Sequence, residues 1–308
     1  MDSVTQFSLG AVIGLAVSPK KTIKIALISG LVATIPDLDI FLSHPDDLTS
    51  TIRHRGFSHS LFYLSVISPL IALFLYKFFS LISYFRWWLL VFLALTTHPI
   101  LDSLTIYGTS LFLPFSDHKV MIGSIFVIDP IYTLPLIVSV GYLFIKKKML
   151  QIKGISFNTI ALVFSQAYLL LTLLIQQALI PSEKSFATPT PFNSLLWRVV
   201  TVNDDYIEQY FVNILGEKGK KIQVENRHYL KSINTNEVDK YANFSSDFYN
   251  LKIVNDQLVL QDLRMGSIEN PAFSFIIAKF IEGEWNLITP YRNKIHFDLQ
   301  GMYGNKKL

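Results

Sequence analysis

Histidine and aspartate side chains occur together within apolar sequence in the first half of this chain. The segment His98-Pro99-Ile100-Leu101-Asp102 directly follows an apolar run at 87–95. Residues four positions apart lie on the same face of a helix, so His98 and Asp102 can contact one ion together. An ionisable group at membrane depth costs free energy and is read as functional by default. This pair is therefore the first candidate for a metal site.

Two further groups of the same residue types precede this pair. They are Pro36-Asp37-Leu38-Asp39 and His54-Arg55-Gly56-Phe57-Ser58-His59-Ser60, and five of the seven histidines fall between His44 and His118. On an extended segment, residues two apart point to one face, which predicts that Asp37 and Asp39 act together. The alternative is a helix-ending loop in which these carboxylates accept from backbone N–H groups.

The two histidines of the second group are five residues apart, which does not suit one face of a regular helix. Gly56 permits a turn between them, and Ser58 is expected to cap the helix that follows. His59 then lies in the first turn of that helix as a ligand, whereas His54 is either a ligand or a solvated loop histidine. Asp129 begins another helix, either as a participant in the site or as a helix cap.

Imidazole and carboxylate groups are the ligands of zinc in hydrolytic sites, and carboxylates also suit manganese and magnesium. The chain has no cysteine, which excludes thiolate ligands, disulfides and cysteine catalysis. Zinc is the first expectation, with manganese or magnesium as alternatives and one or two ions in the site. The candidate ligands are Asp37, Asp39, His54, His59, His98 and Asp102.

The composition indicates an integral membrane protein. Of 308 residues, 51% are hydrophobic and 16% are charged, against about 25% charged in a typical soluble domain. The net charge is +4, and lysines cluster beside apolar segments. This charge pattern is better explained by membrane orientation than by nucleic-acid binding, so the lipid bilayer is the expected partner and nucleic acid is not.

Residues 1–180 predict a helical membrane bundle of about five or six segments. A spanning helix needs about 20 apolar residues. Candidate segments occur at 60–76, 87–104, 125–145 and 155–180, with shorter ones at 4–17 and 23–35. Alternation places nine Lys and Arg residues at one end and three at the other, which predicts that the nine are cytoplasmic. The segment 37–59 and the end of the His98 helix then lie on the outer face.

Residues 181–308 predict a small extracytoplasmic domain that is rich in antiparallel strands. A proline-containing linker at 181–191 opens it, and short segments rich in β-branched and aromatic residues follow, with one or two helices, one of them expected at 235–242. Arg264 ends one of these segments. It either reaches an anionic substrate or is an exposed edge residue, as arginines usually are.

These motifs, in this order over roughly residues 1–180, resemble the YdjM-like family of membrane-bound, predicted metal-dependent hydrolases. The chain has Gln6 where many members of that family carry a histidine. The family is distantly similar to zinc-dependent phospholipase C, which implies phosphoester hydrolysis with Asp37, His59, His98 and Asp102 as ligands. The matching segments are Pro-Asp-Leu-Asp at 36–39, His-Arg-Gly-Phe-Ser-His-Ser at 54–60, His-Pro-Ile-Leu-Asp at 98–102, Tyr-Gly-Thr at 107–109 and Ser-Ile-Phe-Val-Ile-Asp-Pro at 124–130.

Together these features predict a metal-dependent hydrolase of the bacterial plasma membrane. A metal-activated water would attack a phosphoester of a lipid or envelope component, with Asp39 or Asp129 as the general base where it is not a ligand. The alternative is a protein without catalysis, either a metal-stabilised membrane scaffold or a transporter. A catalytic site keeps one coordination position open, whereas a structural site is closed by four protein ligands. The sequence carries no signal for the oligomeric state.

Overall fold

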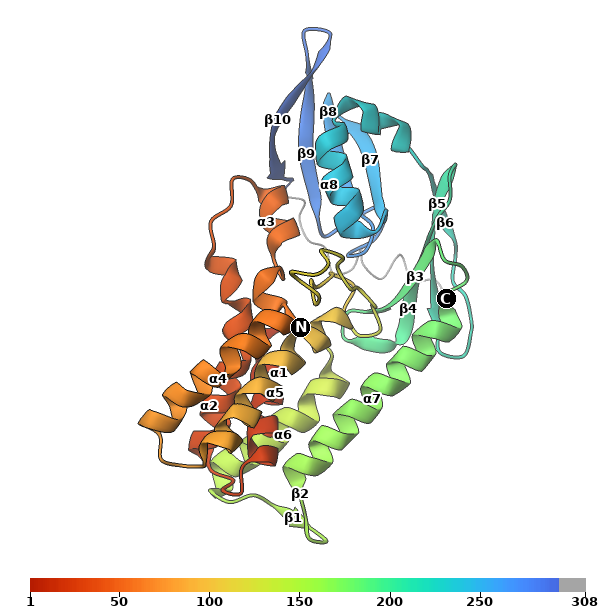
Figure 1. Cartoon of the computed structure of the whole chain (residues 1–308). Helices are drawn as coiled ribbons and strands as arrows, with labels where there is room; N and C mark the ends of the chain where they lie inside the picture. Colours follow the sequence, from red (N-terminus) through yellow and green to blue (C-terminus); the bar gives the residue numbers. More distant parts are fainter. Residues whose placement is uncertain (294–308) are drawn as a thin grey trace.

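The computed structural model describes residues 1–293 as a helical bundle followed by two antiparallel sheets. In Figure 1 the bundle forms the lower part of the molecule and the sheets lie above it. Helices occur at each predicted apolar segment, because long apolar runs without glycine or proline clusters favour helix. The α-helices of the first part are α1 (Ser3–Val17), α2 (Ile23–Ala33), α3 (Asp47–Arg53), α4 (Leu61–Phe78), α5 (Tyr84–Ser103), α6 (Pro130–Lys146) and α7 (Phe157–Leu179), with short 3-10 segments η1 (Ile35–Phe41) and η2 (Phe57–His59).

Helices α1, α2 and α5 form the closely packed centre of the bundle. Glycines make the approach of α1 to α2 possible: a Cβ atom at Gly10 would lie 2.3 Å from the Cβ of Ala33, and one at Gly14 would lie 2.1 Å from the hydroxyl of Ser29. Trp87 is fully buried where α5 packs on this pair. The end of α2, where η1 begins, is held against α5 by the contact between His98 Nδ1 and the carbonyl oxygen of Ala33.

The prediction of five or six membrane segments is not confirmed. Within residues 1–293, α4 and α7 are the two helices long and apolar enough to cross a bilayer, on length and composition alone. The helices α1, α2 and α6 have 15, 11 and 17 residues, short of the roughly 20 that a span requires. Helix α5 has 20 residues but carries Arg86, His98 and Asp102, which lower its apolar character.

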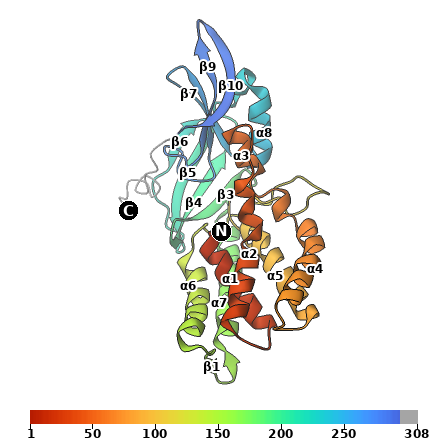
Figure 2. The same ribbon diagram turned by 90° about the vertical axis from the view of Figure 1, so that its left-hand side faces the viewer.

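The connections between the helices gather basic residues at one end of the bundle. The α1–α2 turn, the α4–α5 turn and the small hairpin of β1 (Gln151–Ile152) and β2 (Ile155–Ser156) all lie at the lower end in Figures 1 and 2. The candidate site and the sheets lie at the opposite end. The basic residues at or near the lower end are Lys20, Lys21, Lys24, Lys77, Arg86, Lys146, Lys147, Lys148 and Lys153.

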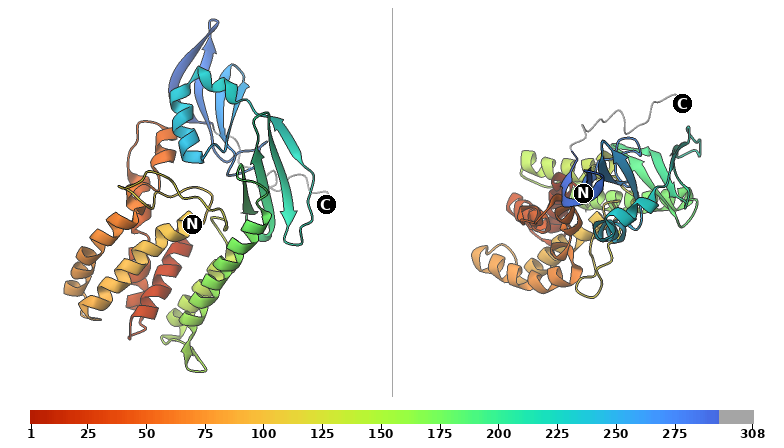
Figure 3. Two further views of the ribbon diagram at one scale, coloured as in Figure 1. Left: turned by 45° about the vertical axis from the view of Figure 1, so that its right-hand side comes forward. Right: turned by 90° about the horizontal axis from the view of Figure 1, so that it is seen from above.

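The second part holds two four-stranded antiparallel sheets, in the orders β3-β4-β5-β6 and β10-β9-β8-β7. Figure 3 shows α7 leading directly into the first sheet. The expected antiparallel strands and the short helix are present. The elements are β3 (Ser185–Thr190), β4 (Asn193–Val202), β5 (Tyr206–Asn213), β6 (Ile222–Glu225), η3 (His228–Ile233), α8 (Thr235–Ser245), β7 (Tyr249–Val254), β8 (Gln257–Asp262), β9 (Ser274–Ile281) and β10 (Glu284–Arg292).

Two expectations for this part are corrected. The segment predicted as a linker contains β3, because an edge strand tolerates proline at positions whose N–H is not needed for pairing. Arg264 is not an exposed edge residue: it is 1% exposed and forms an ion pair with Asp262 at 2.7 Å. Its guanidinium also donates to the carbonyl oxygen of Tyr107 at 2.8 Å, so it ties the sheets to the loop that follows α5.

Candidate metal centre

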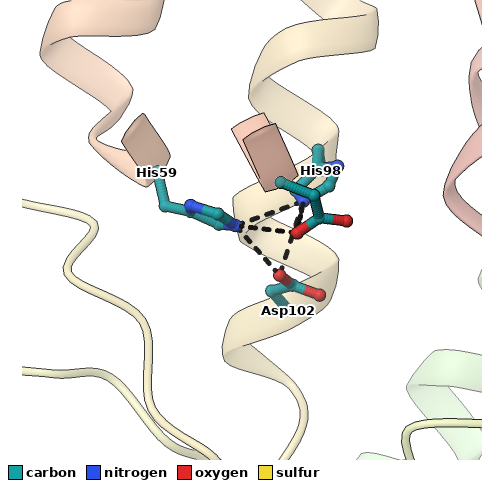
Figure 4. A group of neighbouring side chains, drawn as sticks. His59, His98 and Asp102 are labelled. Carbon is teal, nitrogen blue, oxygen red and sulfur yellow. Dashed lines mark hydrogen bonds and ion pairs between the residues drawn. The ribbon is translucent and has the colours of Figure 1, made fainter. Parts of the chain in front are cut away.

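Four side chains meet at the end of the bundle that faces the sheets. Asp37 comes from η1, His59 from η2, and His98 and Asp102 from the last turns of α5. Figure 4 shows the His59 ring pointing toward the pair that α5 presents. One ligand atom from each residue lies within 4.8 Å of the other three. His98 and Asp102 share a helix face as their spacing predicts, and the remaining two come from separate 3-10 segments.

The separations between these atoms fit a tetrahedral metal ion. A zinc ion with nitrogen and oxygen ligands at about 2.0–2.1 Å holds neighbouring ligand atoms about 3.3–3.4 Å apart. The His59 and His98 Nε2 atoms are 3.2 Å apart, and each lies 3.3–3.5 Å from Asp37 Oδ1 and from Asp102 Oδ2. Five of the six separations therefore match those around a zinc-sized cation.

The Nδ1 atoms of both histidines already have hydrogen-bond partners, which leaves their Nε2 atoms free to bind a metal. His98 Nδ1 lies 2.6 Å from the carbonyl oxygen of Ala33, which can only accept, so this nitrogen carries the hydrogen. His59 Nδ1 lies 2.9 Å from the hydroxyl of Ser58, and that hydroxyl donates to Asp39 at 3.0 Å. The partners thus select the tautomer in which each Nε2 presents a lone pair.

Asp102 is fully buried and held from several sides. Gln6 donates to its Oδ1 at 3.1 Å, and the amino group of Met1 contacts the same oxygen. Its Oδ2 accepts no well-aligned hydrogen bond, although the Nε of Arg55 lies 3.0 Å away as an ion pair. An unsatisfied carboxylate oxygen in a dry environment is costly, and a metal ion at the centre of the group would satisfy it.

Asp37 is the accessible member of the group. Its side chain is 19% exposed, whereas His59, His98 and Asp102 are fully buried. Burial raises the pKa of the Asp37 carboxyl, but the adjacent His59 and His98 imidazoles outweigh this effect, and the pKa lies below its usual range. Asp37 is therefore ionised at neutral pH, which is the form that binds a metal.

Asp39 and His54, both predicted as ligands, form an outer layer around the four. The segment at 35–41 is a 3-10 helix rather than extended, so Asp37 and Asp39 point in different directions. Asp39 accepts from the Arg55 backbone N–H at 2.8 Å and lies 2.9 Å from His54 Nδ1. Burial raises the pKa of the Asp39 carboxyl, but His54 and His59 lower it by more, so the net shift of this pKa is downward.

Asp129, predicted as a base, ligand or cap, does not join this group. It caps α6 by accepting from the backbone N–H groups of Ile131 and Tyr132, and its other oxygen accepts from the Tyr168 hydroxyl at 2.7 Å. The cap expected at Ser58 is instead Ser60, which accepts from the third residue of α4. Ser58 links the metal group to Asp39.

Arg55 is the residue of this centre that the sequence reasoning missed. It is 5% exposed, pairs with Asp102, donates to the Thr105 hydroxyl at 3.1 Å and lies over the Tyr107 ring. Its backbone has a φ of 58°, a left-handed value uncommon outside glycine. Gly56 was expected to form the turn here. The sequence did offer one signal, since Arg55 lies between the candidate ligands His54 and His59. Its role becomes clear only when its tertiary partner Asp102 is known.

The fold and the site together define a class of membrane protein. Its members have a helical bundle with a buried group of His and Asp side chains at one end, and here the bundle is joined to antiparallel sheets. The model of the YdjM inner membrane protein family matches residues 1–179, and the chain belongs to this family. The resemblance seen in the motifs is thereby confirmed. It also supports a location in the bacterial inner membrane.

Two relatives match part of the chain. "Uncharacterized protein YfhP" of Bacillus subtilis is 33% identical over 126 residues, which are 40% of this chain and 37% of that protein. "Inner membrane protein YbcI" of Escherichia coli is 31% identical over 121 residues, 38% of this chain and 69% of that protein. The match thus spans little more than a third of YfhP. No solved structure matches this chain, and the similarity to zinc-dependent phospholipase C stays a prediction.

Proposed function

We propose that this protein is an integral membrane hydrolase that cleaves phosphoesters of a lipid or envelope component. The divalent metal, with zinc as first choice, is held by Asp37, His59, His98 and Asp102. The observation that carries the proposal is the make-up of this group: three fully buried ligands and one partly exposed aspartate. Structural zinc sites are built mainly from cysteine, whereas catalytic ones use histidine and carboxylate.

The residues around the group have distinct parts in this proposal. A bound metal lowers the pKa of a water molecule to about 7 and polarises the phosphoryl oxygen under attack. Ala33 and Ser58 keep the Nε2 atoms of His98 and His59 aimed inward. Asp39 is a positioning residue that acts through Ser58, since both of its oxygens are engaged. Asp129 caps α6, and we assign it no step.

The charge distribution supports an outward-facing site. Nine basic residues lie at the end of the bundle opposite to the metal group, and cytoplasmic loops are the ones enriched in Lys and Arg. The metal group, the loop at 105–129 and the sheets would then face outward from the inner membrane. In this orientation a lipid of the outer leaflet can reach the site by lateral diffusion.

The proposal is tested on the full chain purified in detergent and loaded with zinc. We expect bound metal and turnover of phosphodiester or phospholipid substrates, with both lost in His98→Ala and in Asp102→Asn. For metal binding the matched control is His118→Ala, since His118 is an exposed loop histidine outside the group. For turnover it is Lys221→Gln, an exposed lysine of the sheet region. Bound metal without hydrolysis of phospholipids or model phosphodiesters would overturn the proposal.

One observation favours a second candidate, a metal-stabilised scaffold. Five of the six separations among the four ligand atoms suit a closed tetrahedron, the arrangement of structural zinc sites, and the sixth, between Asp37 and Asp102, is within 4.8 Å. Cobalt in place of zinc separates the two, because the visible spectrum reports its ligands. An open position predicts that inorganic phosphate shifts the spectrum, and a closed site predicts an unchanged spectrum.

A further inference from the structure

A cavity of about 880 Å³ lies beside the metal group, between the bundle and the sheets. Its walls come from η1, α3, the loop that follows α5 and α8. Figure 2 shows α3 next to α8 on this side of the molecule. Asp39 belongs both to the cavity wall and to the outer layer of the metal centre. One side-chain layer therefore separates the cavity from His59.

The polar side of the cavity carries three cations, Arg53, Lys119 and Lys240. Lys119 is only 9% exposed, and its ammonium donates to the carbonyl oxygen of His54 at 2.7 Å. Among residues 1–293, neither Lys119 nor Arg53 has a carboxylate within ion-pair distance. A buried ammonium without a counter-ion is costly, and an anionic ligand would supply the missing charge.

Two carboxylates also line the cavity, and they do not cancel this charge. Asp39 is committed to His54, Ser58 and the Arg55 N–H. Asp117 is exposed to solvent. The remaining cation, Lys240, is half exposed and paired with Glu237 outside the cavity lining.

Part of the cavity lining is apolar and lies next to a candidate membrane span. Leu42 and Phe57 line the cavity and are 47% and 59% exposed. Phe115, 77% exposed on the neighbouring loop, packs edge-on against Phe62 in the first turn of α4 with ring centroids 5.3 Å apart. The outer face of α4 continues this surface with the exposed side chains of Val66, Leu70, Leu73 and Phe74.

We propose that this cavity binds the phosphate-bearing headgroup of an anionic membrane phospholipid. The phosphate lies against Lys119 and Arg53, and the acyl chains leave over Leu42 and Phe57 toward the outer face of α4. This inference rests on the proposed function and deepens it by naming the substrate class. A lining that combines cations with exposed aromatic and aliphatic side chains matches the two halves of such a lipid.

The test measures lipid binding separately from turnover. The full chain carrying His98→Ala, which removes a metal ligand, is titrated in neutral detergent with short-chain phosphatidylglycerol. Dioctanoylglycerol, which has no phosphate, and inorganic phosphate serve as comparison ligands. In this background we expect Arg53→Gln and Lys119→Met to weaken phosphatidylglycerol binding by about tenfold or more, the size of a lost charge-assisted hydrogen bond. The matched control Lys221→Gln removes an exposed lysine just before β6, and it should leave phosphatidylglycerol binding unchanged.

Each outcome decides the inference. The inference would be overturned if phosphatidylglycerol bound equally to all variants, or if inorganic phosphate bound as tightly as the lipid. Because Arg53 is exposed, Arg53→Gln tests the loss of a cation without altering a buried position. Charge-dependent lipid binding without turnover by the metal-loaded native chain would leave the headgroup site standing and remove the proposed hydrolase.

Discussion

The Nε2 atoms of His59 and His98 lie 3.2 Å apart, and the contacts of both rings place the hydrogens on the far nitrogens. Two lone pairs therefore face each other beside the carboxylates of Asp37 and Asp102. The lone pairs and the carboxylates repel one another unless a positive charge lies between the four groups. A divalent cation supplies that charge at the separations observed.

Removal of one histidine should therefore abolish metal binding. We expect the native chain to retain about one zinc ion after dialysis and His98→Ala to retain none, because three remaining ligands lose both affinity and geometry. Elemental analysis of the purified proteins measures this directly. His118→Ala should keep the metal. Equal metal in His98→Ala would mean that the ion lies elsewhere.

Asp39→Asn should weaken metal binding without removing the site. The Asp39 carboxylate contacts the hydroxyl that accepts from His59, so its loss affects the ligand only through Ser58. Outer-layer changes of this kind reduce metal affinity by about 10- to 100-fold. A titration with a competing chelator should show lower affinity but full occupancy at excess zinc.

The control for this titration is Asp117→Asn, an exposed carboxylate on the same cavity, which should bind zinc like the native chain. A loss of zinc even at saturation in Asp39→Asn would show that Asp39 is itself a ligand, as the sequence allowed.

The difference between Asp37 and Asp39 shows where sequence reasoning ends. The His98 and Asp102 pair could be predicted because both lie on one helix, where a spacing of four fixes the shared face. Asp37 and Asp39 could not be separated, because Pro36 allows both an extended segment and a 3-10 turn. The choice depends on which carboxylate meets the histidines, a contact that arises only in the tertiary structure.

The sheets show the same limit. Strands such as β8 follow from a short apolar run, here Leu258-Val259-Leu260, next to a turn signal. The burial of Arg264 does not, because its partners Tyr107 and Phe244 are 157 and 20 residues away and do not appear in its local sequence. An isolated arginine at a strand end therefore reads as exposed until its carbonyl partners are known.

Loss of Arg264 should destabilise the sheet region strongly. Arg264→Met leaves the carboxylate of Asp262 buried with only the Tyr241 hydroxyl and the backbone as partners. Breaking one side of a buried ion pair costs about 3–5 kcal/mol. We expect a clearly lower thermal midpoint, followed by circular dichroism in the strand region.

The matched control is Arg227→Gln. Its ion pair with Glu225 is largely exposed, so this substitution should lower the free energy of unfolding by at most about 1 kcal/mol. Equal midpoints for Arg264→Met and the native chain would show that the buried pair does not hold the sheets to the loop at Tyr107.

Lys119→Met should stabilise the chain most at low pH. Burial, with Arg264 and Arg55 nearby, lowers the pKa of Lys119 to about 7 from its usual 10.5. Below pH 7 the folded chain must keep a buried ammonium, so the destabilisation is fully present there. Between about pH 7 and 10.5 the unfolded chain binds more protons than the folded one, and native stability rises with pH. The advantage of Lys119→Met therefore shrinks over this range.

Thermal unfolding of the native chain and of Lys119→Met at a series of pH values from 6 to 10 measures this difference, and effects of pH on the metal group cancel because both proteins share it. Lys240→Met, which removes a half-exposed lysine from the same cavity, should show no such trend. A difference that stays constant with pH would mean that the Lys119 ammonium has a counter-ion in the folded chain. Added phosphatidylglycerol should flatten the trend, since a bound anion compensates the ammonium and stabilises its protonated form.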